Sequence, residues 1–250
     1  MDALFRAAMQ VRASRPAFGR LVRQTSAVIR EWLDVSEHPC VAFSGGKDSS
    51  VMLYLIRALR PDTPAMYGDD EYVFPETKEL VATTPNVFKT AGHIQHSEWF
   101  TAWDDRSQLP ADREWVESVE FKSLTAQWLH NHGYDGIAVG LRAEENSGRR
   151  IGIKTYGQVF FAQAKKLWTC WPLAYWKTDD IWTAIVYYNI PYNRAYDRMF
   201  ELGVPRNLQR IGPFGNHKAV AMGQMTVIKR GWPELYNRFY AAHPDAGRYL

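Results

Sequence analysis

The sequence has 250 residues, which is enough for one large α/β domain or two small ones. Apolar residues make up 46% and aromatic residues 14%, so the composition is that of a folded chain and excludes intrinsic disorder. The net charge of +3 excludes a polycation, and any contact with nucleic acid must therefore come from a local basic patch. No apolar stretch approaches membrane-spanning length, and the N-terminal segment lacks the apolar core of a secretory signal, so no membrane partner is expected.

The two cysteines, Cys40 and Cys170, lie far apart, and no CxxC pair occurs. This pattern argues against a disulfide framework and against a four-cysteine zinc or iron–sulfur site. We therefore expect no iron–sulfur cluster, and we expect the protein to work in the reducing cytoplasm.

In chain order, the apolar residues alternate between helix-like and strand-like patterns. The segment 1–20 suits an amphipathic helix, and 97–115 is typical of an irregular excursion. The patterns predict helices over 21–33, 49–59, 76–82, 115–132 and 179–188, and strands over 40–43, 65–67, 86–89, 136–140 and 167–173. Strands that alternate with helices predict an α/β fold, a parallel twisted sheet flanked by helices. We expect an N-terminal helical arm over 1–35, a central domain over 36–200 and a C-terminal helical extension of the same domain over 201–250.

The turn Ser44–Ser49, SGGKDS, joins the first predicted strand to a helix. Free N–H groups at a helix start, together with the helix dipole, attract anions. Gly45 and Gly46 let the backbone approach a ligand closely, the serines add hydroxyl groups, and Lys47 adds a full charge. The turn is neither a Walker A loop nor a GxGxxG fingerprint. A hexapeptide of this kind between a buried strand and a helix predicts a phosphate site.

This hexapeptide is similar to the signature of the PP-loop ATP pyrophosphatases, which cleave ATP between the α and β phosphates. The resemblance implies an adenine nucleotide alpha-hydrolase-like fold of the HUP or Rossmann-like type, with ATP and Mg²⁺ as cofactors. It implies an adenylylated product and a pyrophosphate site made by Ser44, Gly45, Gly46, Lys47, Asp48 and Ser49. Ser44, Lys47 and Asp48 are predicted to be catalytic, and Asp48 is predicted to act by orienting the loop and not by taking a proton.

Three further segments resemble the phosphoadenosine-phosphosulfate reductase branch of that family. Asp69–Thr77, DDEYVFPET, is similar to the element that follows the second strand in this branch. Gly140–Arg150, GLRAEENSGRR, is similar to its arginine-bearing loop, and Trp171–Asp197 to its third segment, which ends in NLPYNPLYD-like residues. Together with the hexapeptide they occur in family order over roughly residues 36–200, which is more specific than any one motif.

The segment after the strand at 136–140 carries several arginines. Gly140 ends that strand, where α/β folds place ligands, and it is predicted to bind ATP. Arg142 beside it is predicted both to bind ATP and to act in catalysis. Arg149 and Arg150 are predicted to hold the phosphate of the substrate, and a solvated charge pair is the alternative.

Carboxylates near the predicted strand ends are the candidate metal ligands. Glu144 and Glu145 either pair with the arginines or help to hold Mg²⁺, and both alternatives stay open. Asp69 is predicted to bind ATP. Asp70 and Glu76 lie in the same segment, and contact with ribose or metal is one alternative for them. For Glu76 a charge at the start of a helix is the simpler alternative.

The chain departs from the reductases at one point. A reductase of this branch needs a catalytic cysteine in an ECGLH-like tail, and no cysteine follows Cys170 here. Activation by adenylylation remains, as in the small subunit of ATP sulfurylase, the FAD synthetases of this fold and the ATP pyrophosphatases of DNA phosphorothioation. The compact chain best resembles the Ssp-type enzyme and not the cluster-bearing Dnd-type, which implies that ATP activates a DNA backbone phosphate for sulfur incorporation. A degenerate module that only binds nucleotide is the non-enzymatic alternative.

The same resemblance implies DNA and a cysteine desulfurase as partners. Cys170 would then carry sulfur as a persulfide, and a buried inert cysteine is the alternative, as we expect for Cys40. Basic residues interleaved with aromatic residues near the C-terminus predict stacking or contact with a DNA backbone, with an ordinary packed helical face as the alternative. Arg210–Lys218 is predicted to be a loop that closes into a helix N-terminus and forms a second anion site.

Overall fold

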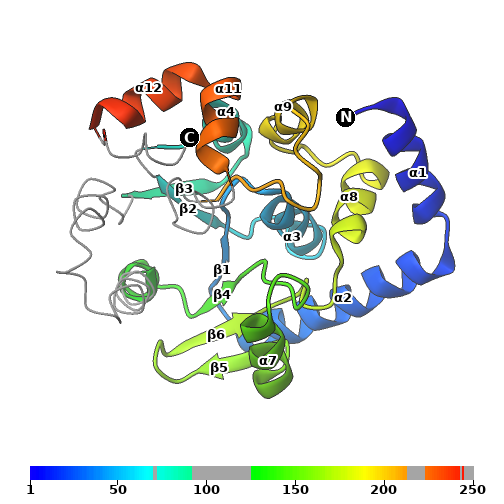
Figure 1. Cartoon of the computed structure of the whole chain (residues 1–250). Coiled ribbons are helices and arrows are strands. Elements are labelled where there is room, and N and C mark those ends of the chain that lie inside the picture. The colour runs from blue at the N-terminus through cyan, green and yellow to red at the C-terminus, as the bar shows by residue number, and fades with distance from the viewer. Residues whose placement is uncertain (70–71, 92–124, 213–222, 243, 245–250) are drawn as a thin grey trace. The chain divides into compact units, whose positions relative to one another are not determined.

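The computed structural model describes residues 1–69, 72–91, 125–212, 223–242 and 244 (Figure 1). The chain divides into two compact units. Unit 1 comprises Met1–Tyr67, Thr83–Phe88 and Ala126–Tyr192, and unit 2 comprises Gly68–Ala82, Lys89–Thr125 and Asn193–Leu250. The predictions made for Asp70, for residues 97–124 and for residues 213–218 lie outside the described residues.

A six-stranded sheet has the strand order β3-β2-β1-β4-β6-β5. Its strands are β1 (Pro39–Ala42), β2 (Ala65–Asp69), β3 (Val87–Ala91), β4 (Gly136–Ala138), β5 (Val159–Ala162) and β6 (Leu167–Cys170). Strand β1 runs parallel to β2 and β4, and β4 runs parallel to β6. All five predicted strands are present, with boundaries that differ by a few residues. Strand β5 was not predicted, because it is an antiparallel edge strand whose residues are only partly buried.

Helices flank the sheet on both faces, as the sequence predicted (Figure 1). On one face, Cys40 of β1 belongs to a buried cluster with Leu129, which lies in a helix over 125–131, the end of the helix predicted over 115–132. Successive residues of a strand point to opposite faces, so Val41, which is also fully buried, faces the other side. Strands buried on both faces read as continuous apolar runs, which is why this part of the sequence was easy to interpret.

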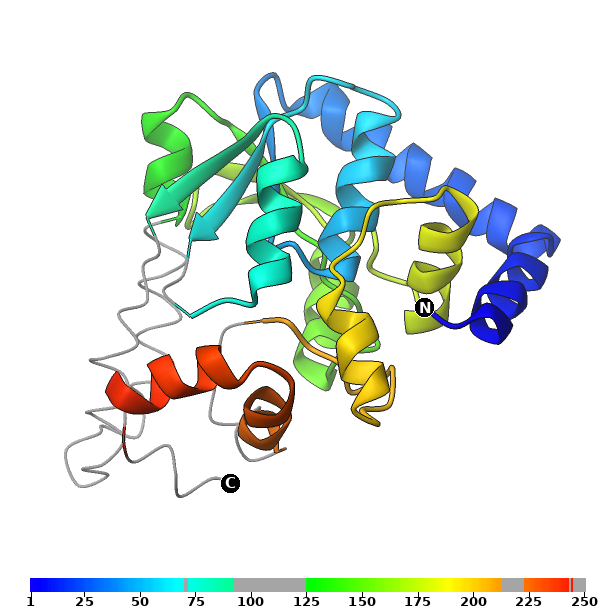
Figure 2. The ribbon, with the colours of Figure 1, turned by 90° about the horizontal axis from the view of Figure 1, so that it is seen from above.

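The helices that lie wholly in unit 1 are α1 (Ala3–Ala13), α2 (Pro16–Val35), α3 (Lys47–Arg57), α7 (Ser147–Tyr156) and α8 (Thr178–Tyr187). Helix α1 lies beside α8 in both views (Figures 1 and 2). The rings of Phe5 and Trp182 meet edge to face with centroids 6.1 Å apart, and Arg12 pairs with Asp180 at 2.7 Å. The N-terminal amphipathic helix expected from the sequence therefore packs onto its own chain.

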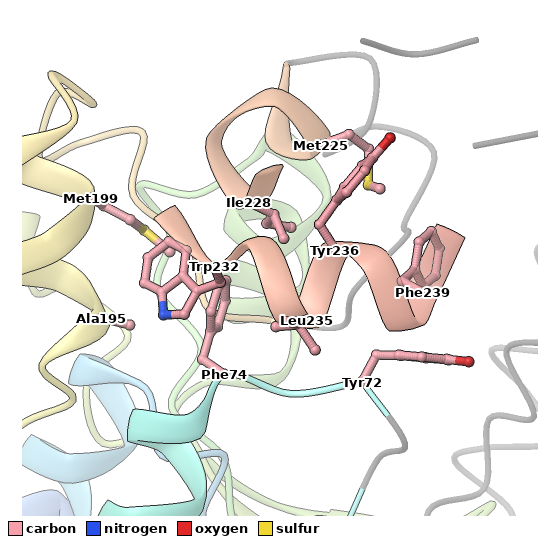
Figure 3. Close-up of a cluster of buried hydrophobic side chains, with 10 residues drawn as sticks. All are labelled: Tyr72, Phe74, Ala195, Met199, Met225, Ile228, Trp232, Leu235, Tyr236 and Phe239. Atoms are coloured by element: carbon pink, nitrogen blue, oxygen red, sulfur yellow. The ribbon is translucent and has the colours of Figure 1, made fainter. Parts of the chain in front are cut away.

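Among the described residues, four further helices are α4 (Pro75–Thr83), α9 (Ala195–Glu201), α11 (Gln224–Gly231) and α12 (Pro233–Ala242). In unit 2 they enclose ten buried side chains, which we call the unit 2 aromatic cluster (Figure 3). Its members are Tyr72, Phe74, Ala195, Met199, Met225, Ile228, Trp232, Leu235, Tyr236 and Phe239. The rings of Phe74 and Trp232 lie 4.5 Å apart, and those of Tyr72 and Phe239 lie 5.0 Å apart. This cluster gives unit 2 a core of its own.

Candidate functional site

The turn between β1 and α3 is held together by its own serines. The hydroxyl oxygens of Ser44 and Ser49 lie 3.2 Å apart, and the N–H of Ser44 donates to Ser49 Oγ at 3.2 Å. The Ser49 hydroxyl in turn donates to the carbonyl of Gly46 at 3.0 Å. Gly45 has φ 70°, a left-handed conformation that a residue with a Cβ adopts only at a cost. The predicted glycine turn is therefore organised by contacts within the loop itself.

Helix α3 begins directly after this turn, and no side chain caps it. Its N-cap residue is Gly46, which has no side chain to accept from the first N–H groups. Gly140 follows β4 and lies against this helix start, since a Cβ added there would sit 3.6 Å from the nitrogen of Ser49. Glycines at both places keep side-chain atoms away from the first turn of α3. An uncapped helix start beside a lysine is an arrangement that favours a phosphate group.

Four charged side chains form a line that starts at this turn. Lys47 Nζ lies 2.9 Å from one oxygen of Asp48, and Nε of Arg142 lies 2.5 Å from the other. Arg142 also donates through Nη1 to Glu144 at 2.8 Å. The side chains of Lys47 and Arg142 are only 3% and 1% exposed. Two cations and two carboxylates thus neutralise one another, which is the usual condition for burying a charge.

Asp48 is the centre of this line. Burial alone would raise the pKa of its carboxyl, but the charges of Lys47 and Arg142 and their hydrogen bonds outweigh burial and lower the pKa below the ordinary value of 3.8. Asp48 is therefore ionised and holds both cations. Both the role of Asp48 in orienting the loop and a direct contact of Arg142 with ATP stay predictions.

Glu144 links the line to the start of α8. One of its oxygens accepts from the backbone N–H of Thr178 at 2.8 Å as well as from Arg142. A carboxylate at a helix N-terminus is stabilised by the free N–H groups there. This contact was not predicted from the sequence, because Glu144 and Thr178 are 34 residues apart.

Arg149 and Arg150 do not lie in a loop, contrary to the sequence-based interpretation. They belong to the first turn of α7, whose N-cap Asn146 accepts from the N–H of Arg149 at 2.8 Å. The Arg149 guanidinium pairs with Glu145, and Arg150 is exposed. Asparagine is a strong N-cap residue, and it was the signal in the sequence that could have located this helix.

These pairings bear on the metal alternative. Glu144 and Glu145 both have arginine partners, so the salt-bridge alternative describes them in this structure. Within the described ranges, no group of three or more His, Cys, Asp or Glu side chains is arranged to hold a metal ion. A Mg²⁺ ion that arrives with ATP would take its ligands mainly from phosphate and water.

The acidic residues of the second segment are placed differently from one another. Asp69 is the last residue of β2. Glu76 lies in the first turn of α4, and both its oxygens accept from Trp232 Nε1 at 2.9 Å. The simpler alternative for Glu76, a charge at a helix start, therefore holds, and it also has a structural partner within unit 2.

Both cysteines are fully buried. Burial raises the pKa of the Cys40 thiol to about 12 and raises that of Cys170 further. A sulfur carrier needs an accessible thiolate, so the surroundings of Cys170 match the alternative of an inert core cysteine. No described helix combines the length and the apolar character that a membrane crossing requires.

Comparisons with known proteins place this geometry in a family. The model of the phosphoadenosine phosphosulfate reductase domain matches residues 38–212. The chain is 26% identical to the uncharacterized protein MJ0066 of Methanocaldococcus jannaschii, over 92% of this chain and 47% of that protein. It is 24% identical to an adenosine 5'-phosphosulfate reductase of Halalkalibacterium halodurans, over 64% of this chain and 68% of the relative. The chain thus spans about half the length of the first curated relatives it matches.

A solved structure shows the same fold. The phosphoadenylyl-sulfate reductase of Candida auris, determined as a phosphate complex, superimposes with a TM-score of 0.52 at 17% identity, over 81% of this chain and 97% of that one. This likeness supports the fold alone, an adenine nucleotide alpha-hydrolase-like sheet. The family match covers the SGGKDS turn, the arginine-bearing segment and the start of α8. The chain therefore belongs to the phosphoadenosine phosphosulfate reductase domain family.

Proposed function

We propose that this chain binds ATP on the turn 44–49 and cleaves it between the α and β phosphates, so that an acceptor becomes adenylylated. The proposal rests on one observation. The glycine turn places Lys47 at the start of α3, and no side chain caps this helix start. Anionic groups at such a helix start are stabilised by N–H groups and by the dipole. One relative is named an adenosine 5'-phosphosulfate reductase, so its substrate is an adenine nucleotide.

The proposed reaction needs little covalent chemistry from the protein. An acceptor oxygen attacks the α phosphorus, the bond from that phosphorus to the bridging oxygen breaks, and pyrophosphate leaves with the electron pair. Lys47 would exchange its contact with Asp48 for a phosphate oxygen and neutralise the charge that develops on the leaving group. Asp48 would stay paired with Arg142 and keep the loop in place, so no general base is required.

We further propose that the acceptor is a backbone phosphate of DNA, activated for sulfur incorporation in the cytoplasm, with a cysteine desulfurase as the sulfur source. The chain offers no exposed thiol for reducing a sulfonucleotide, since both of its cysteines are buried. An acceptor phosphate is instead compatible with a site whose charged groups would bind and orient phosphates. The sulfur in this proposal comes from the partner and not from Cys170.

The test measures pyrophosphate release from purified protein and ATP with DNA, sulfate or FMN as the acceptor. We expect DNA, and neither sulfate nor FMN, to stimulate pyrophosphate release. Ser44→Ala should abolish this release because Ser44 organises the turn. Dependence on sulfate or FMN would contradict the proposed acceptor. ATP binding without release in all three reactions would contradict the enzymatic proposal. Mass spectrometry of nucleosides from cells with and without the gene then checks for phosphorothioate dinucleotides.

A further inference from the structure

Positive charge is concentrated in the last segment of the chain. Residues 193–250 hold nine lysines and arginines against four acidic residues, whereas residues 1–192 hold 21 against 23. This segment contributes α9, α11 and α12 to unit 2. The acidic excess of unit 2 lies in its earlier segments, 68–82 and 89–125. The chain therefore carries a local basic region although its net charge is small.

Three of these cations lie over rings of the unit 2 aromatic cluster. The Arg198 guanidinium is 5.1 Å from the ring centroid of Trp232. Lys229 Nζ is 5.4 Å from that of Tyr236, and the Arg238 guanidinium is 5.4 Å from that of Tyr72. Because the three rings belong to one cluster, the three cations lie around one and the same core.

These cations keep their charge exposed. The side chain of Arg198 is 49% exposed, and Lys229 and Arg238 are also exposed. An exposed side chain of this kind keeps its charged end in contact with water while its stem lies over the ring, so an anion from solution can reach it. Arg198 also forms an ion pair with Glu76, with Nη1 and Oε1 3.9 Å apart, and half of its side chain remains exposed.

Exposed aromatic rings accompany the cations. Tyr240 stacks on Tyr236 with centroids 5.8 Å apart and planes 10° from parallel, and it is 42% exposed. Phe200 is equally exposed and has the Arg206 guanidinium 4.0 Å from its centroid. Arg206 is only partly exposed, whereas Tyr240 stacks on the ring that lies under the exposed Lys229. An exposed ring next to an exposed cation is the kind of surface on which an unpaired base stacks while its phosphate is neutralised.

We propose that the surface of α9, α11 and α12 binds single-stranded nucleic acid. Arg198, Lys229 and Arg238 contact its phosphates, and Tyr240 supplies a stacking face. A single strand fits better than a duplex, because the base faces of a duplex are stacked on one another and unavailable to tyrosine. The claim that this strand accepts the adenylyl group rests on the proposed function. The binding of the strand by unit 2 does not, because it needs no ATP.

The test uses the full chain without nucleotide and a fluorescent single strand of about 15 nucleotides, a length that one single-strand-binding fold can cover. Fluorescence anisotropy gives the dissociation constant at several salt concentrations. For R198Q/K229Q/R238Q, the slope of log affinity against log salt should fall by about 2, since each neutralised phosphate contributes about 0.7. The matched control R20Q/R23Q/R30Q removes the same charge from exposed positions of α2 and should leave the slope unchanged.

The aromatic part of the proposal has its own variant. Y240A should weaken binding at least about fivefold, the lower end of what one stacked base contributes, while Y240F should bind like the unchanged protein. Equal losses in both triple variants, tighter binding of the matching duplex, or equal competition by polyglutamate of the same charge would each overturn the proposal. The S44A protein should bind the strand normally even though it releases no pyrophosphate, which separates this proposal from the proposed function.

Discussion

Cations are handled in opposite ways in the two units of this protein. In unit 1, Lys47 and Arg142 are buried and matched by the carboxylates of Asp48 and Glu144. In unit 2, Arg198 and Arg238 are exposed and lie over aromatic rings. A buried cation requires a counter-charge, because leaving it unpaired costs several kcal/mol. An exposed cation stays in contact with water and carries no comparable burial cost. The first arrangement therefore organises a site, and the second places charge at the surface.

The comparison predicts its largest effect at Arg142. Arg142→Ala leaves Asp48 and Glu144 without their shared partner, and we expect the free energy of unfolding to fall by about 3–5 kcal/mol. Urea unfolding monitored by tryptophan fluorescence measures this change in the free energy of unfolding. The control Arg150→Ala, at an exposed position of α7, should change stability by less than about 0.5 kcal/mol. Equal stabilities of the two variants would show that the buried line of charges is not a structural element.

Lys47 provides the next largest effect, on activity. Lys47→Ala should lower the rate of pyrophosphate release by about 10²–10³-fold, the loss typical for one group that stabilises transition-state charge. Asp48 keeps Arg142 as a partner in this variant, so the protein should remain folded by circular dichroism. Lys154→Ala on the exposed surface of α7 is the control and should retain full activity. A rate within threefold of the unchanged protein would remove Lys47 from the mechanism.

Asp48 makes the buried arrangement sensitive to acid. Its pKa is lowered on folding, so the stability it contributes is fully present above the ordinary value of 3.8 and is lost as the pH falls toward the folded-state pKa. The difference in unfolding free energy between the unchanged protein and Asp48→Asn should be constant near neutral pH and should shrink below about pH 4. Urea titrations at several pH values measure this difference. A difference that does not change down to pH 3 would contradict the ionised pair.

The smallest effect is expected at the cations of unit 2. Arg238→Gln removes one contact with Tyr72 at an exposed position, and we expect it to cost about 0.5–1 kcal/mol of stability. Thermal unfolding compared with Arg230→Gln, an exposed position of α11, checks this value. A loss as large as that of Arg142→Ala would mean that unit 2 also depends on neutralised buried charge, and the comparison between the units would fail.

How far the sequence predicted the fold depended on burial. The central strands were predicted because residues such as Val41 and Ile137 are buried on both faces and form apolar runs. Strand β5 was missed because an edge strand with partly exposed residues has no such run. Helix α7 was taken for a loop because its segment is polar and its cap at Asn146 was overlooked.

The residues of the candidate site were predicted from the sequence, but the contacts between them were not. SGGKDS identified Ser44–Ser49 as a phosphate turn, since glycines, hydroxyls and a lysine at a strand-to-helix junction serve few other purposes. The sequence could not show that Arg142 reaches Asp48, because that contact joins residues 94 positions apart. The interpretation of Arg149 as a phosphate ligand failed to anticipate its pairing with Glu145.

The sequence by itself determined the strand-to-helix turn, the class of sheet and the family, because these depend on local residue order and on apolar periodicity. Only the tertiary structure decided which charges neutralise one another and which remain exposed. That choice depends on burial and on distances between segments remote in the chain, since a charge in the interior must find an opposite charge within a few ångströms. Two examples illustrate this choice. Asp48 lies between the buried cations Lys47 and Arg142, whereas the exposed Arg238 lies over the ring of Tyr72.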